Sequence, residues 1–366
     1  MTKPLKIILA GGGTGGPTSP LLAVASALTQ MRPDAQFLFI GTLAGPERQL
    51  VEEAGIKFVP ISAGKLRRYF SFSNAADFFR TLKGYFQAKK ILREFQPDLV
   101  FSVGSFVAVP VIYAARKLKI KILIHQQDAR IGLANKLTAP FAHCITTAFE
   151  KTAKEFYAGT GFEKNPKVRT EWVGNPVRRE FLNNDTTGRE FFQLHGDLPI
   201  LLIFGGATGA EQINTVTYEA LPELLKAHQI IHITGRGKRI DYRDPNYHQY
   251  EFLSKEMPVA MKVADIVVSR AGLSTIAELS ALGKIAVLVP MPDSHQEENA
   301  QILKDANAAV VLSKDEFTAE TFARVIVSLK FNQKRLELLQ NNIRNIMPHD
   351  SAERIAKIII EKFDVK

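Results

Sequence analysis

Short apolar runs recur along the chain, and stretches with helical periodicity separate most of them. In the first half the runs are 6–10, 36–40, 57–61, 99–102 and 121–124; in the second half they are 200–204, 230–234, 250–253, 266–268 and 285–289. Strands that alternate with helices are typical of parallel sheets built from βαβ units. The pattern therefore predicts an α/β protein.

The order of these elements indicates two domains. A chain of 366 residues is long enough for two cores. The strand, glycine turn and helix at 6–28 recur at 200–227, and Val173–Arg178 looks like a link. We expect domains at 1–172 and 177–347, each a Rossmann-like parallel sheet, facing each other across a cleft. A last helix at 351–363, within 348–366, could pack back on the first domain.

Glycine turns follow several of the predicted strands. The first spans Gly11–Gly16, the second is Val103-Gly104-Ser105, and a third spans Gly205–Ala210. Glycine allows positive φ and close backbone approach, so such a turn could hold a pyrophosphate. The spacing is not G-x-G-x-x-G, and no Walker lysine follows. A tight turn without a ligand therefore stays open as the alternative.

The stretch 266–299 has the composition of a nucleotide-sugar site. One strand ends at Ser269–Gly272 before a helix that carries Glu278, and the next strand opens into the polar segment 291–299. Strand carboxyl ends and helix N-termini favour phosphate. Glu278 would accept hydrogen bonds from ribose, and sugar hydroxyls would meet His295, Gln296 and Asn299. Helix capping is the alternative for these side chains.

Two further groups of polar residues could bind a ligand, or they could have an ordinary structural role. Arg178 in the link could neutralise a diphosphate, or it could be a surface arginine. The strand 121–124 ends in His125-Gln126-Gln127-Asp128, with Asn135 a short distance beyond. A binding role and a capping role are equally compatible with that cluster.

The amino-acid composition limits the kinds of ligand, metal and membrane contact that can be expected. The formal charge of +10 favours an anionic partner. The single cysteine excludes a disulfide framework and a cysteine-rich zinc site, and no apolar run approaches the length of a membrane span. The chain has no Asp-x-Asp, which argues against a metal-bridged diphosphate. We therefore expect no metal and no cofactor.

Residues 65–95 are both basic and aromatic. Eight basic residues stand against two acidic ones, with eight aromatic residues among them. This composition favours a patch on an anionic membrane surface. The proposed patch residues are Arg67, Arg68, Phe70, Phe72, Phe79, Arg80 and Lys83. A solvated helix with one buried face is the alternative, and no nucleic-acid recognition pattern is present.

Taken in order, several motifs resemble the MurG family. They are Gly12-Gly13-Thr14-Gly15-Gly16, Gly132-Leu133-Ala134-Asn135, Gly174–Arg178, Gly205–Ala210, and Ser269–Gly272 with Thr275, Glu278, Gln296, Asn299 and Ala300. The resemblance covers nearly the whole chain. It implies a GT-B fold and an inverting, metal-independent transfer of N-acetylglucosamine (GlcNAc) from UDP-GlcNAc to a muramyl-pentapeptide carried on a polyprenyl diphosphate. It also implies peripheral attachment at the cytoplasmic face of the cell membrane and a role in peptidoglycan synthesis.

The resemblance also assigns residues to the two substrates. Donor-binding positions are Thr14, Gly15, Asn135, Arg178, Thr208, Gly209, Arg270, Gly272, Thr275, Glu278, His295, Gln296 and Asn299. The acceptor pyrophosphate would be held by Gly12, Gly13, Gly15, Gly16, Gly104 and Ser105. UDP-GlcNAc is a substrate in this scheme, not a resident cofactor.

The sequence departs from the family on the acceptor side. The family usually has histidine where this chain has Pro17, His-Glu-Gln-Asn where it has His125-Gln126-Gln127-Asp128, and a second glycine at Ser105. The attacking C4 hydroxyl must lose a proton, so a base is needed. Asp128 is the first candidate and His125 the second. Alternatives are a transferase for another lipid acceptor, or an inactive nucleotide-sugar-binding protein at the membrane.

Overall fold

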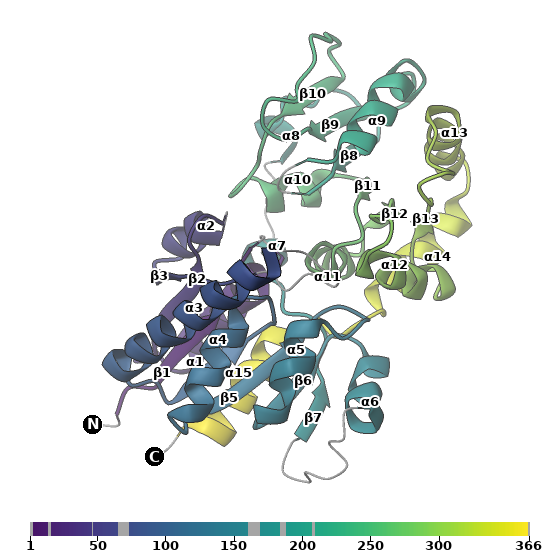
Figure 1. The fold of residues 1–366 in the computed structure, drawn as a ribbon. Helices are drawn as coiled ribbons and strands as arrows, with labels where there is room; N and C mark the ends of the chain where they lie inside the picture. Colours follow the sequence, from purple (N-terminus) through teal and green to yellow (C-terminus); the bar gives the residue numbers. More distant parts are fainter. Residues whose placement is uncertain are drawn as a thin grey trace. The chain divides into compact units, whose positions relative to one another are not determined.

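The computed structural model describes residues 3–13, 16–45, 47–64, 73–159, 169–183, 188–206 and 209–364. The chain divides into two compact units (Figure 1). The first unit comprises Met1–Arg178 and Pro348–Lys366, and the second comprises Arg179–Met347. Each unit contains one sheet with helices packed against it.

The first unit is built on a seven-stranded parallel sheet in the order β3-β2-β1-β4-β5-β6-β7. Its strands are β1 (Lys6–Ala10), β2 (Gln36–Thr42), β3 (Lys57–Ile61), β4 (Leu99–Ser102), β5 (Lys121–Gln126), β6 (Cys144–Thr147) and β7 (Arg169–Trp172). Its helices are α1 (Thr18–Met31), α2 (Glu47–Glu53), α3 (Ser73–Phe95), α4 (Ala108–Lys117), α5 (Leu133–Thr138), the 3-10 turn η1 (Ala139–Phe141), α6 (Glu150–Gly159) and α15 (Ser351–Phe363).

Alternation along β1 shows why this sheet is covered on both faces. Ile7 and Leu9 belong to one buried cluster, which includes side chains of α1 and α15. Ile8 and Ala10 belong to the other cluster, which includes side chains of α3 and α4. Successive side chains of a strand point to opposite faces, so an all-apolar strand needs a layer on each side. The last helix of the chain thus completes the core under α1 (Figure 1).

The second unit has a six-stranded parallel sheet in the order β10-β9-β8-β11-β12-β13. Its strands are β8 (Ile200–Phe204), β9 (Gln229–Ile233), β10 (Tyr247–Tyr250), β11 (Ile266–Ser269), β12 (Ile285–Leu288) and β13 (Val310–Val311). Its helices are α7 (Arg179–Leu182), α8 (Gly188–Phe191), α9 (Glu211–Leu224), α10 (Met257–Val263), α11 (Leu273–Leu282), α12 (His295–Asp305), α13 (Ala319–Lys330) and α14 (Gln333–Arg344).

The prediction of two parallel, Rossmann-like sheets is confirmed. The strand predicted at 250–253 is wrong by three residues, because Tyr247 is the buried side chain that β10 places beside Ile230. The short strands β6, β7 and β13 were not predicted. Within the described residues, no helix is both long and apolar enough to cross a membrane.

Candidate functional site: two sheet edges with glycine loops

The glycine loops of the first unit lie where its strand order reverses. β1 and β4 are neighbours, and the chain leaves them toward opposite ends of the sheet. Gly12, Gly13 and Gly104 follow these two strands, and all three have positive φ. In open parallel sheets, ligands bind outside the carboxyl ends of strands at such a switch point. This position makes the two loops the candidate acceptor site.

Neighbouring side chains crowd the positions that β-carbons would occupy in these loops. A β-carbon on Gly13 would lie 2.8 Å from Cε1 of Phe106, and one on Gly104 would lie 3.0 Å from Oδ1 of Asn135. Ser105 has φ +86°, and its buried Oγ has no hydrogen-bond partner among the described residues. Gly16, a predicted acceptor residue, lies just before α1. Gly15, predicted for both substrates, and Thr14, predicted for the donor, lie outside the described residues.

A buried amide network holds the loop after β5. Asn135 donates through Nδ2 to Oε1 of Gln126 at 2.7 Å and to the carbonyl of His125 at 3.3 Å. Gln126 donates through Nε2 to the carbonyls of Asp128 at 2.9 Å and Arg130 at 3.0 Å. The network fixes the backbone around the half-buried Asp128, the predicted base. Oδ1 of Asn135 is buried and has no hydrogen-bond partner within the described part of the chain.

His125 lies inside the first unit. Its Nδ1 is 3.0 Å from Oγ1 of Thr146, and its Nε2 is 3.2 Å from Oδ1 of Asn175. The side chain is fully buried, and burial lowers the pKa of His125 to about 4. A neutral imidazole with both nitrogens engaged favours a positioning role. That role extends to the link, because Asn175 lies three residues before the half-buried Arg178.

The glycine turns of the second unit occupy the equivalent switch point, between β8 and β11. After β8 the chain reaches Gly206 and Gly209, which both have positive φ. A β-carbon on Gly209 would lie 2.2 Å from the carbonyl oxygen of Thr234, so the turn packs directly on the backbone that follows β9. Thr208 lies outside the described residues.

Two side chains hold the loop after β11 in place. Arg270 donates through Nη1 to the carbonyls of Val289 and Pro290, both at 3.1 Å. Burial lowers the pKa of the Arg270 guanidinium from its ordinary value. The fully buried Asn299 donates through Nδ2 to the carbonyl of Ala271 at 3.2 Å. These bonds connect the ends of β11 and β12 with α12, so three segments of the predicted donor site form one assembly.

The remaining donor residues lie on α11 and α12. Gly272 is the N-cap of α11, with Thr275 half-buried on the first turn and Glu278 buried on the second. At α12 the hydroxyl of Ser294 caps the helix, and Oε1 of Gln296 accepts from the backbone N–H of Met291 at 3.0 Å. His295 is exposed on the first turn. Gln296 therefore shapes its own loop as well as offering an amide group.

One buried carboxylate was missed by reasoning from sequence. Glu47, at the start of α2, accepts from the backbone N–H of Thr42 at 2.8 Å. A β-carbon on Gly12 would lie 2.4 Å from its Oε1, so the carboxylate supports the first glycine loop. Its Oε2 is buried without a hydrogen-bond partner within the described residues. The only sequence signal is an acidic residue seven positions after the end of a predicted strand.

The helix α3 presents an apolar face to solvent. Phe78 is 61% exposed, Phe79 is 68% exposed and Phe86 is 60% exposed, while Ala88 and Leu92 are buried against the sheet side. Lys83 is exposed beside them, and Arg80 pairs with Asp77 at 3.0 Å. Contiguous exposed apolar side chains mark interaction sites. The other predicted patch residues, Arg67, Arg68, Phe70 and Phe72, lie outside the described residues.

Comparison with known proteins identifies the family. Residues 7–147 match the glycosyltransferase family 28 N-terminal domain, and residues 200–358 match the glycosyltransferase family 28 C-terminal domain. The chain is 37% identical over 365 residues to the UDP-N-acetylglucosamine--N-acetylmuramyl-(pentapeptide) pyrophosphoryl-undecaprenol N-acetylglucosamine transferase of Lachnoclostridium phytofermentans, covering 97% of this chain and 98% of that relative. The protein of the same name from Clostridium tetani is 35% identical over 369 residues, covering 99% of each chain.

A solved structure agrees with these relatives. The crystal structure of Acinetobacter baumannii MurG superposes with a TM-score of 0.72 at 26% identity, covering 98% of this chain and 100% of that one. The two family 28 domains match in order, and the relatives align over nearly their whole length. The chain therefore belongs to the MurG family of family 28 glycosyltransferases.

Proposed function

We propose that this protein transfers GlcNAc from UDP-GlcNAc to the lipid-linked N-acetylmuramyl-pentapeptide, the reaction for which its relatives are named. The observation that carries the proposal is the pair of switch points, each with positive-φ glycines at the carboxyl ends of two strands. One such site per unit suits a reaction with two phosphate-bearing substrates.

The donor belongs in the second unit. The buried carboxylate of Glu278 would accept hydrogen bonds from the ribose hydroxyls, and the start of α11 would face the diphosphate. Gln296, on the first turn of the helix after β12, would contact the sugar, whereas the fully buried Asn299 would hold the loop after β11 in place. Arg178 would add a cation to the leaving diphosphate. No resident metal is proposed, because the chain lacks an Asp-x-Asp and supplies cations of its own.

The acceptor belongs in the first unit. Its diphosphate would lie at the loop that contains Gly12 and Gly13, with Ser105 from the neighbouring loop. The acceptor C4 oxygen attacks the anomeric carbon from the face opposite UDP, the bond to UDP breaks, and UDP leaves with the bonding electrons. The hydroxyl proton passes to a base, for which Asp128 is proposed. Pro17, at the N-cap of α1, has no side chain that can accept a proton.

Attachment to an anionic membrane surface is part of the proposal. The exposed aromatic face of α3 and the basic residues beside it support it, since such faces bury aromatic rings at lipid headgroups. The relatives act on an undecaprenyl-linked substrate by name, which requires access to lipid. Binding to vesicles with and without anionic lipid tests this attachment.

A turnover assay tests the proposed function. Purified protein is incubated with labelled UDP-GlcNAc and lipid-linked muramyl-pentapeptide, and labelled lipid and free UDP are both measured. We expect equal amounts of transferred sugar and released UDP. Transfer only to a different lipid, such as diacylglycerol, would replace the proposed acceptor. Tight UDP binding with neither transfer nor release would indicate an inactive binding protein, consistent with Pro17, and would overturn the proposal.

A further inference from the structure

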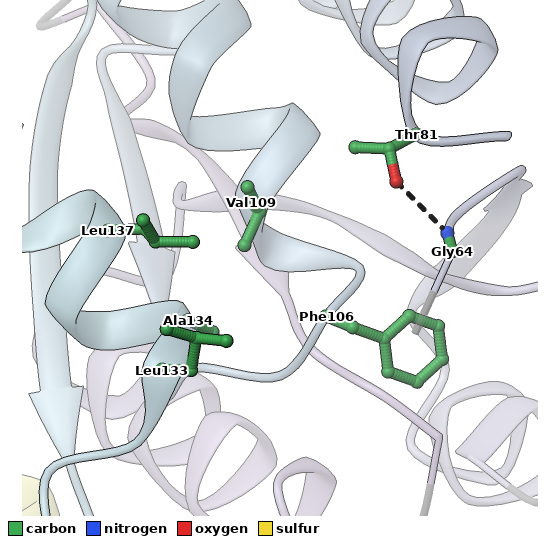
Figure 2. A pocket seen from close by; sticks show the side chains of 7 residues that line it. All are labelled: Gly64, Thr81, Phe106, Val109, Leu133, Ala134 and Leu137. Atoms are coloured by element: carbon green, nitrogen blue, oxygen red, sulfur yellow. Dashed lines mark hydrogen bonds between the residues drawn. The ribbon is translucent and has the colours of Figure 1, made fainter. Parts of the chain in front are cut away.

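An apolar cavity lies in the first unit between α3, α4 and α5. Its volume is about 190 Å³. Figure 2 shows the residues that line it: Gly64 after β3, Thr81 from α3, Phe106 from the turn before α4, Val109 from the first turn of α4, and Leu133, Ala134 and Leu137 from α5. Leu133 is 39% exposed, so the cavity reaches the surface on the side of α5.

Among the described residues of this lining, Thr81 has the only polar side chain, and its hydroxyl already has hydrogen-bond partners. The hydroxyl of Thr81 donates to the carbonyl of Asp77 at 2.8 Å and accepts from the backbone N–H of Gly64 at 3.2 Å (Figure 2). The other side chains of the described lining are aliphatic or aromatic, so a hydrocarbon group gains free energy when it leaves water to fill this space. The lining thus selects a hydrocarbon group.

The volume limits that group to a few carbons. A dry cavity of about 150 Å³ is large enough for benzene, whereas pockets for whole drug-sized ligands begin at about 300 Å³. A space of about 190 Å³ therefore fits a branched unit of about five carbons and excludes a nucleotide.

One aromatic ring separates this cavity from the first glycine loop. Phe106 lines the cavity, and its Cε1 would lie 2.8 Å from a β-carbon on Gly13. In a polyprenyl diphosphate, the first isoprenoid unit is bonded directly to the diphosphate oxygen. A diphosphate at Gly12 and Gly13 would therefore place that unit next to the cavity.

The cavity also adjoins the exposed face of α3. Thr81, which lines it, lies on the same helix as the exposed Phe78 and Leu82, one turn or less away. Two lining residues thus connect the cavity with its surroundings: Phe106 adjoins the first glycine loop, and Thr81 lies on the helix that carries the exposed aromatic face. A chain that leaves the cavity along α3 would reach lipid.

We propose that this cavity binds the first isoprenoid unit of the lipid-linked acceptor. The proposal rests on the proposed function and specifies how the acceptor's chain is recognised. Anchoring of the unit at Phe106 and Val109 fixes the diphosphate relative to the glycine loop. The enzyme would then distinguish acceptors by the chain next to the diphosphate.

A filled cavity tests the proposal. Ala134→Leu adds three carbon atoms on α5 toward the space, and the exposed Ala54→Leu on the C-terminal side of α2 is the matched control. Two acceptors are compared, one with a polyprenyl chain and one with a methyl group on the same diphosphate. We expect Ala134→Leu to raise KM for the polyprenyl acceptor about tenfold, the loss of roughly two buried methylene groups, with little change for the methyl acceptor. KM for UDP-GlcNAc and binding to anionic vesicles should stay as in wild type.

Each contrary result has a separate meaning. An unchanged KM, or the same increase for both acceptors, would overturn the cavity proposal while wild-type transfer upholds the function. A loss of vesicle binding in Ala134→Leu would assign the cavity to membrane acyl chains instead. Wild-type protein that transfers to neither acceptor would overturn the proposed function itself.

A second measurement does not depend on the folding of a variant. Wild-type protein is photolabelled with an acceptor that carries a diazirine on its first isoprenoid unit, and labelled peptides are identified by mass spectrometry. We expect labels on the segments that contain Val109 and Leu137. Labels confined to the exposed residues Phe78–Phe86 would contradict the proposal.

Discussion

Nε2 of His125 lies 3.2 Å from Oδ1 of Asn175, fifty positions further along the chain. Since Oδ1 of an asparagine can only accept, Nε2 carries the proton and Nδ1 accepts from the hydroxyl of Thr146. The bond attaches β5 to the segment that leads to Arg178. The neutral form of the imidazole is therefore part of the folded structure.

The stability of the protein should fall in mild acid because of this histidine. The pKa of His125 is lowered to about 4 in the folded state, against about 6.5 when unfolded. Between these values the unfolded chain binds a proton that the folded chain does not, so stability is lost as the pH falls through this window. From pH 7 to pH 5 we expect a loss of about 2 kcal/mol from this group.

Urea unfolding at the two pH values checks this expectation, with His125→Gln as the comparison. The variant keeps a neutral side chain at both pH values, so its loss of stability should be smaller by that amount. The other buried histidine with a strongly lowered pKa, His232, titrates equally in both proteins and cancels in the difference. Equal pH dependence of the two proteins would contradict the assignment.

Asp128→Asn should lower kcat by about 10² while the affinity for UDP stays unchanged. An amide keeps the shape of the side chain and cannot take the proton of the acceptor hydroxyl. Single-turnover rates and UDP titrations measure the two quantities. Glu155→Gln, at an exposed position on α6, is the matched control and should behave as wild type. A wild-type rate for Asp128→Asn would exclude this residue as the base.

Glu278→Gln should weaken UDP binding about tenfold, because a hydrogen bond to a charged group is worth about 1.5 kcal/mol or more. The loss should be much smaller for UDP analogues without ribose hydroxyls, since the carboxylate has nothing to accept from them. Calorimetric titration of both ligands against both proteins gives a thermodynamic cycle, which isolates the interaction between Glu278 and the ribose hydroxyls. Glu298→Gln, exposed on α12, is the control. Equal losses for both ligands would show that Glu278 does not hold the ribose.

Ser105→Gly should raise the free energy of unfolding by about 1 kcal/mol. Ser105 has φ +86°, a conformation that costs a residue with a β-carbon about 1–2 kcal/mol, partly offset by the flexibility of glycine in the unfolded chain. Urea unfolding measures the change. Ser105→Ala removes the buried hydroxyl and keeps the β-carbon, so it separates the two causes. A gain of equal size in Ser105→Ala would assign the effect to the hydroxyl.

Removal of divalent metal should leave turnover unchanged. Arg178 and the N-terminus of α11 are proposed to stabilise the leaving diphosphate without a bridging ion. Initial rates are measured after dialysis against EDTA and again after Mg²⁺ is added back. Activity that disappears with EDTA and returns with Mg²⁺ would contradict this expectation.

Local sequence patterns predicted many of the strands, helices and glycine loops of the protein. Strand β1 and helix α15 have the bounds that hydrophobic periodicity predicts, and the glycine loops follow the predicted strands. These features depend on residues close together in the chain, where apolar runs and turn-forming residues are directly visible. The residues of the loop after β11 were also predicted, although the bonds of Arg270 and Asn299 to backbone carbonyls were not.

Features that depend on distant parts of the chain were not predictable. Glu47 looks like an ordinary acidic residue at a helix start, and only the pairing of β1 with β2 brings it under Gly12. β7 has charged residues and no fully buried position, so its pattern does not resemble a strand. His125 illustrates the same limit, since its burial depends on Thr146 and Asn175.

The return of α15 to the first unit has a consequence for synthesis on the ribosome. Ile355, Ile359 and Phe363 belong to the same buried cluster as Leu21, so that cluster stays incomplete until α15 has emerged. The second unit is encoded entirely before that point. Nascent chains should therefore acquire protease resistance in Arg179–Met347 first, although the other unit is the first to leave the exit tunnel.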